Sequence, residues 1–141
     1  MKNIFFTLIC LVFIEQSCSS QRTICEMRLK EAVAKNWKYD SSNKAYITSI
    51  AFLNGIDSTY KDCIYGKDTS FISKLFGLDY KIEMTEIPTI RADFPISLIY
   101  ALSPPCNDSP NSYCKIFLFF VSKTGTVGKS AIYNEGGSLS Y

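Results

Sequence analysis

Apolar residues recur at every third or fourth position between residues 23 and 37, which is the spacing of one buried helical face. Thr23 and Glu26 have the spacing of a capping box, so this helix is expected to begin at Ile24. The polar run at residues 40–43 has turn chemistry and is expected to end the segment. The side chains predicted to face inward are Cys25, Leu29, Ala32, Val33 and Trp37.

The next apolar segment, Lys44 to Leu53, fits two structures. Its apolar residues can share one face of a helix, but its content of β-branched and aromatic residues also suits a strand. The helix is the preferred interpretation, and Asn54-Gly55 is expected to break it.

A short helix between two glycines is the clearest local prediction. Asp68 is a favourable N-cap, and Gly77 stands where a left-handed residue is wanted after the last turn. Leu78 can then fold back as the apolar contact of that cap. The apolar side of the helix would consist of Phe71, Ile72, Leu75 and Phe76.

After this helix the period of the pattern changes to two. Residues 80–85 alternate apolar and polar side chains, which is typical of a half-exposed strand. Pro88 and Pro95 bracket a predicted loop, and Ile96 to Leu102 is expected to form a second strand. Lys123-Thr124-Gly125 has the composition of a hairpin turn before a last strand from Val127.

The strand from Lys115 to Ser122 is apolar on both faces, so it is expected to be central and covered on both sides. The first face consists of Phe117, Phe119 and Val121, and the second face of Ile116, Leu118 and Phe120. We expect the N-terminal helix or the Lys44–Leu53 segment to cover the second face, with a bound partner as the alternative. The whole pattern predicts an α+β fold, in which two or three N-terminal helices pack on a three- to four-stranded antiparallel meander sheet.

The N-terminus has the pattern of a secretory signal. A lysine at position 2 precedes an apolar run from Ile4 to Ile14, which is shorter than the roughly 20 residues that span a bilayer. A buried N-terminal helix or strand is the alternative. The predicted organisation is a signal peptide of lipoprotein type over 1–17, a tether over 18–22, a single domain over 23–134 and a flexible tail over 135–141.

Cys18 is the candidate for lipidation. The run Ser17-Cys18-Ser19-Ser20 resembles a bacterial lipoprotein signal, in which the cysteine becomes the acylated (palmitate-bearing) first residue. Glu15 and Gln16 depart from the usual residues before that cysteine, so simple cleavage after Ser19 and release as a soluble secreted protein remain the alternative. Acyl chains on Cys18 would anchor the domain to a membrane.

Four cysteines remain after Cys10 and Cys18 are set aside, and an even number in an exported chain implies disulfides. Three pairings are possible. Proximity favours Cys106 with Cys114, which leaves Cys25 with Cys63. No C-x-x-C pair is present, so a zinc site is disfavoured and no metal is expected.

The composition argues against most enzyme chemistry. The chain has no histidine, which removes the residue most used for acid–base catalysis near neutral pH and the commonest metal ligand. It has no phosphate-binding or dinucleotide motif, so no cofactor is expected. Glu83 and Glu86 would point to opposite faces of a strand. A net charge of +2 gives no footprint for nucleic acid.

Two segments carry a resemblance to a known family. GKDTSFISKLFG (66–77) resembles the glycine-bounded helix of the SmpA/OmlA group of small lipoproteins, which includes the accessory lipoprotein of the outer-membrane β-barrel assembly machine. IFLFFVSKTGTV (116–127) is similar to that group's closing hairpin, and the β-lactamase inhibitory proteins look like relatives of the same fold. The similarity covers residues 63–134 and departs from the group at Leu78-Asp79, where a proline is usual. It implies a non-catalytic domain that binds protein.

The sequence therefore predicts a lipid-anchored, non-enzymatic interaction or scaffold module of the bacterial cell envelope, at the outer membrane or periplasm, with an unidentified protein partner. An inhibitor or immunity protein that blocks an envelope enzyme or toxin is the alternative, and a small hydrolase or binder of apolar ligands is a weaker one. The 103–113 loop is stiffened by prolines and is expected to be closed by a disulfide, so it would lose little entropy on binding. The candidate partner-binding residues are Pro104, Pro105, Asn107, Asp108 and Tyr113.

Overall fold

The computed structural model describes residues 21–102, 115–134 and 138–140, and it shows an α+β fold of helices packed on an antiparallel sheet. The elements follow in the order α1 (residues 21–36), β1 (Lys38–Asp40), β2 (Ala45–Ile47), α2 (Ile50–Ser58), α3 (Lys61–Ile64), α4 (Thr69–Phe76), β3 (Lys81–Met84), α5 (Pro88–Arg91), β4 (Ile96–Ala101), β5 (Lys115–Val121), β6 (Val127–Asn134) and β7 (Ser138–Ser140).

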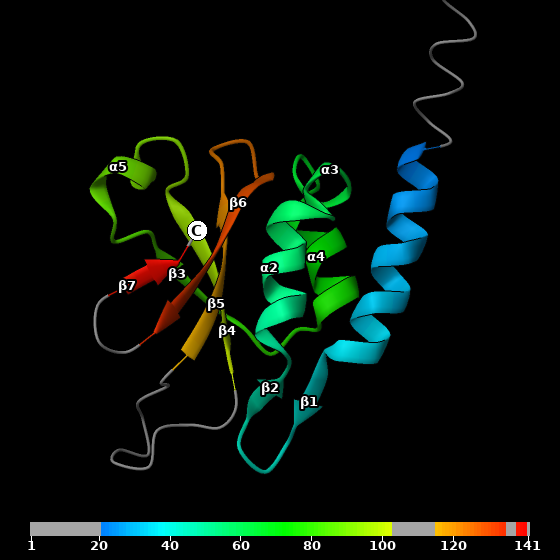
Figure 1. Cartoon of the computed structure of the whole chain (residues 1–141). Coiled ribbons are helices and arrows are strands. Elements are labelled where there is room, and N and C mark those ends of the chain that lie inside the picture. Colours follow the sequence, from blue (N-terminus) through cyan, green and yellow to red (C-terminus); the bar gives the residue numbers. More distant parts are fainter. Residues whose placement is uncertain (1–20, 103–114, 135–137, 141) are drawn as a thin grey trace, which may run out of the picture.

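The main sheet is a meander in the order β3-β4-β5-β6-β7, with every neighbouring pair antiparallel. A separate two-stranded sheet, β1-β2, follows α1. Figure 1 shows α2 and α4 between the main sheet and α1, whereas α5 lies on the other side of the sheet. All the long helices therefore cover the same face.

The main core lies between this first face and the helices. Phe117 and Phe119 of β5 meet Phe76 of α4 and Tyr100 of β4, with the Phe76 and Phe119 ring centroids 5.1 Å apart. Trp37 stacks on Tyr46 at 4.6 Å. Each fully buried ring or leucine here contributes roughly 1.5–3 kcal/mol of burial free energy, so this cluster is the main source of stability.

The end of α1 is fixed to the end of α4 by one polar contact within this apolar cluster. The Trp37 Nε1–H donates to the Phe76 carbonyl oxygen at 2.8 Å. That carbonyl belongs to the last turn of α4, where backbone acceptors have no partner inside the helix. The indole therefore packs as an apolar group while satisfying an otherwise unpaired acceptor.

The predicted caps of α4 are confirmed. The Asp68 side chain accepts from the Phe71 backbone N–H at 2.8 Å, and Gly77 adopts a φ of 95°. A Cβ at Gly77 would lie 2.5 Å from the Tyr46 hydroxyl, so both the conformation and the space require glycine. The expectation that Leu78 folds back onto this cap is wrong, as its side chain is 77% exposed.

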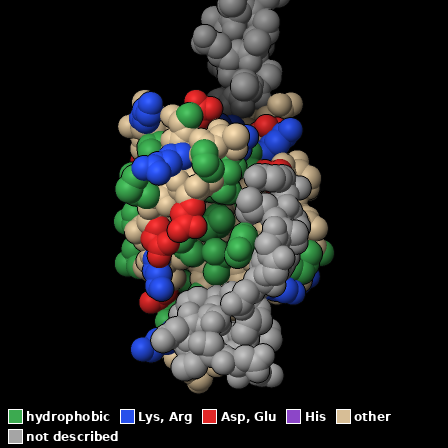
Figure 2. Space-filling view, turned by 90° about the vertical axis from the view of Figure 1, so that its left-hand side faces the viewer, with side chains coloured by type: hydrophobic (Ala, Val, Ile, Leu, Met, Phe, Trp, Pro, Cys, Tyr) green, Lys and Arg blue, Asp and Glu red, His purple; other side chains and the backbone are tan. Residues whose placement is uncertain are grey.

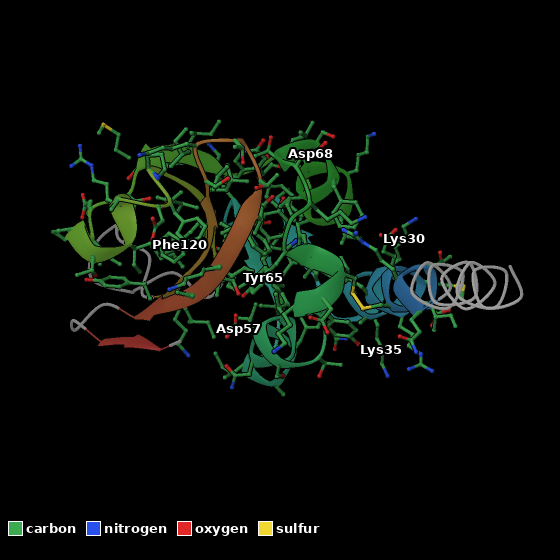
Figure 3. All side chains as sticks on the ribbon, turned by 90° about the horizontal axis from the view of Figure 1, so that it is seen from above. Lys30, Lys35, Asp57, Tyr65, Asp68 and Phe120 are labelled. Carbon is green, nitrogen blue, oxygen red and sulfur yellow. A yellow bond between two sulfur atoms is a disulfide. The ribbon has the colours of Figure 1, made fainter. Side chains whose placement is uncertain are left out.

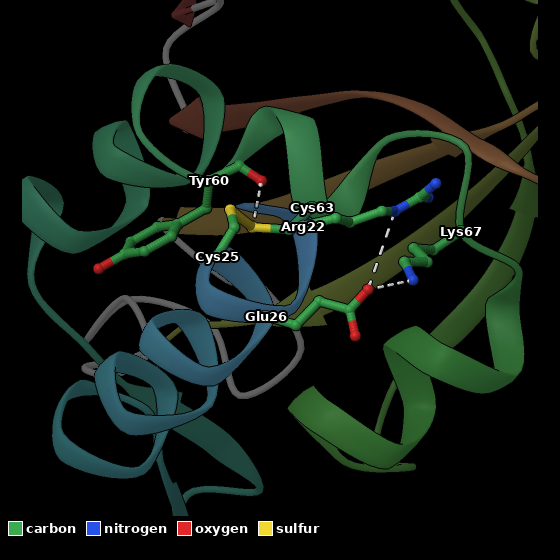
Figure 4. Close-up of a disulfide and its surroundings, with 6 residues drawn as sticks. All are labelled: Arg22, Cys25, Glu26, Tyr60, Cys63 and Lys67. Carbon is green, nitrogen blue, oxygen red and sulfur yellow. Dashed lines mark hydrogen bonds and ion pairs between the residues drawn. A yellow bond between two sulfur atoms is a disulfide. The ribbon is translucent and has the colours of Figure 1, made fainter. Parts of the chain in front are cut away.

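Helix α1 is held to the α3–α4 region by a covalent bond and a charge cluster (Figure 4). Cys25 and Cys63 form a disulfide with a Cα–Cα distance of 5.8 Å. Directly after Cys25, Glu26 accepts from Lys67, and Arg22 approaches the same carboxylate at 3.9 Å. The disulfide is the pairing that spacing and elimination favoured among the three possible.

Several local expectations are corrected by the structure. Helix α1 already includes residues 21–23, so Thr23 is not its cap. The Lys44–Leu53 segment is neither one helix nor one strand: it forms β2 and then the start of α2, which begins at the N-cap Ser49. Gly55 lies inside α2, because burial of the neighbouring residues outweighs the cost of a helical glycine.

The element counts also differ from the prediction. In the described part of the chain, four helical segments precede the main sheet, and a fifth, α5, forms a turn inside the predicted loop between Pro88 and Pro95. The sheet gains β7 from residues 138–140, which were expected to belong to a flexible tail. These short elements form because neighbouring strands and apolar side chains hold them, and local sequence alone does not specify them.

Candidate functional site

The second face of the sheet carries a separate and smaller apolar cluster. Leu118 and Phe120 of β5 are joined there by Ala131 of β6 and Ile90 of α5, all of them buried. Ile99 and Ile116 lie beside them and are only partly buried. Figure 3 shows Phe120 on the side of the sheet away from Asp57 and Tyr65. The apolar second face is therefore real, but it is not fully enclosed by the described residues.

The second face is partly covered by residues 85–95, which include α5 and are called the α5 segment. Phe94 packs so closely on β6 that a Cβ at Gly128 would lie 2.1 Å from its ring. The Thr85 and Ser97 hydroxyls are 2.8 Å apart, and the Thr85 backbone N–H donates to the Pro95 carbonyl oxygen at 2.9 Å. These contacts anchor both ends of the α5 segment to the sheet.

The expectation that α1 or the Lys44–Leu53 segment covers the second face is wrong. Both contribute to the core on the first face, where Leu29, Trp37 and Tyr46 are buried. The physical reason is the disulfide and the aromatic cluster, which commit these segments to the same side as α4. Among the described residues, the short α5 segment covers part of the second face.

A groove of about 210 Å³ opens between the α5 segment and the sheet. Its floor is apolar and its rim carries two carboxylates, from Glu83 and Glu86. Figure 2 looks onto this side of the molecule and shows hydrophobic side chains in its centre beside a group of acidic ones. The lining consists of Glu83, Met84, Thr85, Glu86, Ile87, Ser97, Ile99, Ile116, Leu118, Phe120 and Tyr133.

The sequence predicted Glu83 and Glu86 on opposite faces of one strand, but in the structure both residues line the same groove. Strand β3 ends at Met84, so the two-residue alternation does not extend to Glu86. Both residues are exposed. The pair gives the groove a negative rim beside an apolar floor, which suits a partner that presents an apolar side chain next to a basic one.

A second hollow of about 460 Å³ continues along the same part of the sheet. It shares Glu83, Ile99 and Ile116 with the groove and extends to Tyr39 and Lys44 of the β1-β2 hairpin. We call the two together the second-face trough. Its open shape suits contact with another surface more than enclosure of a small molecule.

The partner-binding residues predicted from the sequence lie outside the described residues. They are Pro104, Pro105, Asn107, Asp108 and Tyr113, and the same holds for Cys106, Cys114 and Cys18. Strand β4 ends at Ala101 and β5 begins at Lys115. The trough residues were missed as a site because their pattern reads only as ordinary strand alternation.

A polar cluster on the other side of the sheet links α2, β6 and the segment after α3. The Tyr65 hydroxyl donates to the Asp57 carboxylate and lies 3.2 Å from the Ser130 hydroxyl (Figure 3). Burial, followed by the bond to Asp57, raises the pKa of Tyr65 to about 12. Tyr65 therefore stays protonated near neutral pH and acts as a structural link, because a general base there would need a pKa near the working pH.

Within residues 21–102, 115–134 and 138–140, no group of three or more Cys, Asp or Glu side chains is arranged to hold a metal ion. In that part of the chain, helices long and apolar enough to cross a membrane are also absent.

Comparison with known proteins gives no relative. No family model matches the chain, and neither the curated proteins nor the solved structures contain a match to it.

Proposed function

We propose that this protein is an exported, lipid-anchored, non-enzymatic module of the bacterial cell envelope that binds a protein partner through the second-face trough. The observation that carries the binding role is the arrangement of the trough: a partly exposed apolar floor formed by Ile99 and Ile116, with Glu83 and Glu86 at its rim. Exposed contiguous apolar surface rimmed by polar groups is a common mark of interaction sites.

Export is supported by the N-terminal pattern and by the disulfide. Cys25 and Cys63 are 38 residues apart in sequence and their bond joins two helices, as in a structural cross-link. Such bonds persist in oxidising compartments and are rare in the cytosol of mesophilic organisms. The lipid-anchoring part of the proposal depends on Cys18 and is tested separately.

The binding proposal is tested by recovering the full-length protein from native membranes and identifying co-purifying proteins by mass spectrometry. Ile99→Asp introduces a charge in the trough floor, whereas Ile47→Asp changes an isoleucine of β2 that is exposed and does not line the trough. We expect a specific partner with the wild type and with Ile47→Asp, and its loss with Ile99→Asp. Equal recovery with both variants, or loss with both, would contradict binding through the trough.

The identity of the recovered protein separates the two functional classes. Outer-membrane proteins would support a scaffold. A single soluble enzyme or toxin held tightly would replace the scaffold by the inhibitor or immunity function. Circular dichroism of each variant shows whether a loss of binding is only a loss of folding.

The anchoring proposal is tested by growing cells with labelled palmitate and separating their membranes from the soluble fraction. We expect label on the wild-type protein and none on Cys18→Ala, which should move to the soluble fraction. An unlabelled wild-type protein would refute lipidation and would support simple cleavage of the signal.

A further inference from the structure

Helix α1 has an inner side in the main core and an outer side exposed to solvent. The inner side carries Cys25, which forms the disulfide, and the buried Leu29 and Val33. Figure 1 places α2 and α4 on this inner side, between α1 and the main sheet. On the outer side, Ile24 is 42% exposed and Met27 is 55% exposed. These two residues are three positions apart, so they are neighbours on the helix surface and form a small apolar strip.

Basic side chains flank this apolar strip. Arg28, Lys30 and Lys35 are exposed, and at helical spacing they fall on both sides of the line through Ile24 and Met27. Figure 3 shows Lys30 and Lys35 on different flanks of α1. A helical surface with apolar side chains between basic ones is typical of helices that lie in a membrane interface.

An excess of positive charge lies on this side of the molecule. The three flanking residues outnumber the exposed Glu31 by two, which equals the formal net charge of the whole chain, +2. The carboxylates of Glu83 and Glu86, in contrast, line the groove on the second face of the sheet. A negatively charged surface would therefore attract the outer side of α1 and repel the rim of the trough.

The candidate lipid anchor directly precedes α1 in the chain. Cys18 stands three positions before residue 21, the first described residue of α1. Three residues span at most about 11 Å when fully extended. An acylated Cys18 would therefore hold the start of α1, and with it Ile24 and Met27, close to the lipid headgroups.

We propose that the outer side of α1 lies on the surface of a membrane that contains anionic phospholipid, an assignment that rests on the proposed lipid anchor for its place in the cell. Ile24 and Met27 enter the boundary between headgroups and acyl chains, and the three flanking basic side chains contact lipid phosphates. An anchor alone would not orient the domain. This contact turns the trough away from the membrane, where a protein partner can reach it.

Vesicle binding tests the contact without the anchor. The full-length chain with Cys18→Ala is mixed with vesicles of phosphatidylethanolamine and phosphatidylglycerol in equal parts, or with vesicles of phosphatidylcholine alone, and sedimented. We expect binding to the anionic vesicles that weakens as salt is raised, because the Debye length falls from about 10 Å at 0.1 M to about 3 Å at 1 M. Equal binding to both kinds of vesicle, or binding to neither, would overturn the proposal.

Paired lysine variants locate the contact on α1. Lys30→Gln/Lys35→Gln should lower the partition coefficient for the anionic vesicles roughly thirtyfold, at about fivefold for each charge. Lys123→Gln/Lys129→Gln is the matched control, because it removes two exposed lysines from the β5–β6 hairpin. We expect this control to bind within about twofold of the parent chain. Equal losses with the two pairs would show that net charge alone controls binding and would overturn the assignment to α1.

The depth of α1 is tested on protein that retains Cys18 and is reconstituted in the same anionic vesicles. Met27→Trp adds an indole to the outer side of α1, and Leu78→Trp is the control, because Leu78 is 77% exposed and lines the trough. Trp37 is buried and contributes equally to both variants. We expect brominated phospholipid to quench the added emission of Met27→Trp and not that of Leu78→Trp. Equal quenching of the two variants, or quenching of neither, would overturn the proposal.

The palmitate label reports the anchor separately from this contact. A labelled wild-type protein whose variants fail the vesicle tests would refute the contact of α1 and leave the anchor standing. An unlabelled wild-type protein that binds anionic vesicles through Lys30 and Lys35 would refute the anchor and leave the contact standing.

Discussion

The two faces of strand β5 carry similar side chains and have different surroundings. Phe117 and Phe119 on the first face enter a core closed by α1, α2 and α4. Among the described residues, Leu118 and Phe120 on the second face meet the α5 segment and its neighbours, and Ile116 beside them is partly exposed. One strand thus belongs both to the stable core of the protein and to the floor of its candidate binding surface.

The difference shows where stability and interaction are separated in this fold. Covalent and aromatic contacts concentrate on the helix side, which can hold the sheet rigid without help from the other face. The second face can then remain open at little cost to folding.

Removing the disulfide should weaken the helix side most. The variant Cys25→Ala/Cys63→Ala frees a loop of 38 residues, which on the chain-entropy model costs about 4 kcal/mol. Urea denaturation would measure the loss in the free energy of unfolding. A loss below about 1 kcal/mol would show that the apolar contacts of α1 suffice to hold it.

Adjacent residues of β4 compare the two faces directly. Leu98→Ala removes a buried side chain on the first face and should cost about 2–5 kcal/mol. Ile99→Ala removes an isomeric side chain from the partly exposed second face and should cost about 1 kcal/mol. The same denaturation measurement applies to both. Equal losses would mean that the second face is as tightly packed as the first.

The contact between Phe94 and Gly128 should control the cover of the second face. Gly128→Ala places a methyl group in the Phe94 ring position, so the ring must move, at an expected cost of about 1–3 kcal/mol. Hydrogen exchange should increase around residues 85–95 and remain unchanged in α1. An increase in α1 as well would show that the two faces are coupled.

The smallest effect concerns pH and the helix side. The pKa of Tyr65 is raised to about 12 from an ordinary value of 10, so its protonated form is favoured in the folded state. This contribution is complete below pH 10 and is lost as the pH rises toward 12. We expect wild-type stability to fall more steeply in that window than the stability of Tyr65→Phe. Parallel slopes for the two proteins would remove Tyr65 from the alkaline transition.

The sequence predicted the elements whose determinants are local. Helix α4 carries its own N-cap and terminal glycine, and the alternation of β5 showed both of its faces. The inward face of α1 was also correct, since Leu29, Val33 and Trp37 are buried. These features depend on residues a few positions apart, and local patterns record them directly.

The parts that the sequence did not predict depend on distant contacts. The choice of the first face by α1 depends on the bond between Cys25 and Cys63, which local spacing could not place in space. The turn α5 forms where Ile90 packs against the second face, and β7 forms by pairing with β6. The trough exists because α5 is short, a fact that appears in no motif.

The position of Trp37 decides how unfolding of this protein can be followed. It is the single tryptophan of the chain, and its indole lies where α1, α4 and β2 meet. Intrinsic fluorescence will therefore report the separation of the helices from the sheet and will be insensitive to opening of the α5 segment. A spectroscopic study of ligand or partner capture on the opposite side will need an added chromophore there.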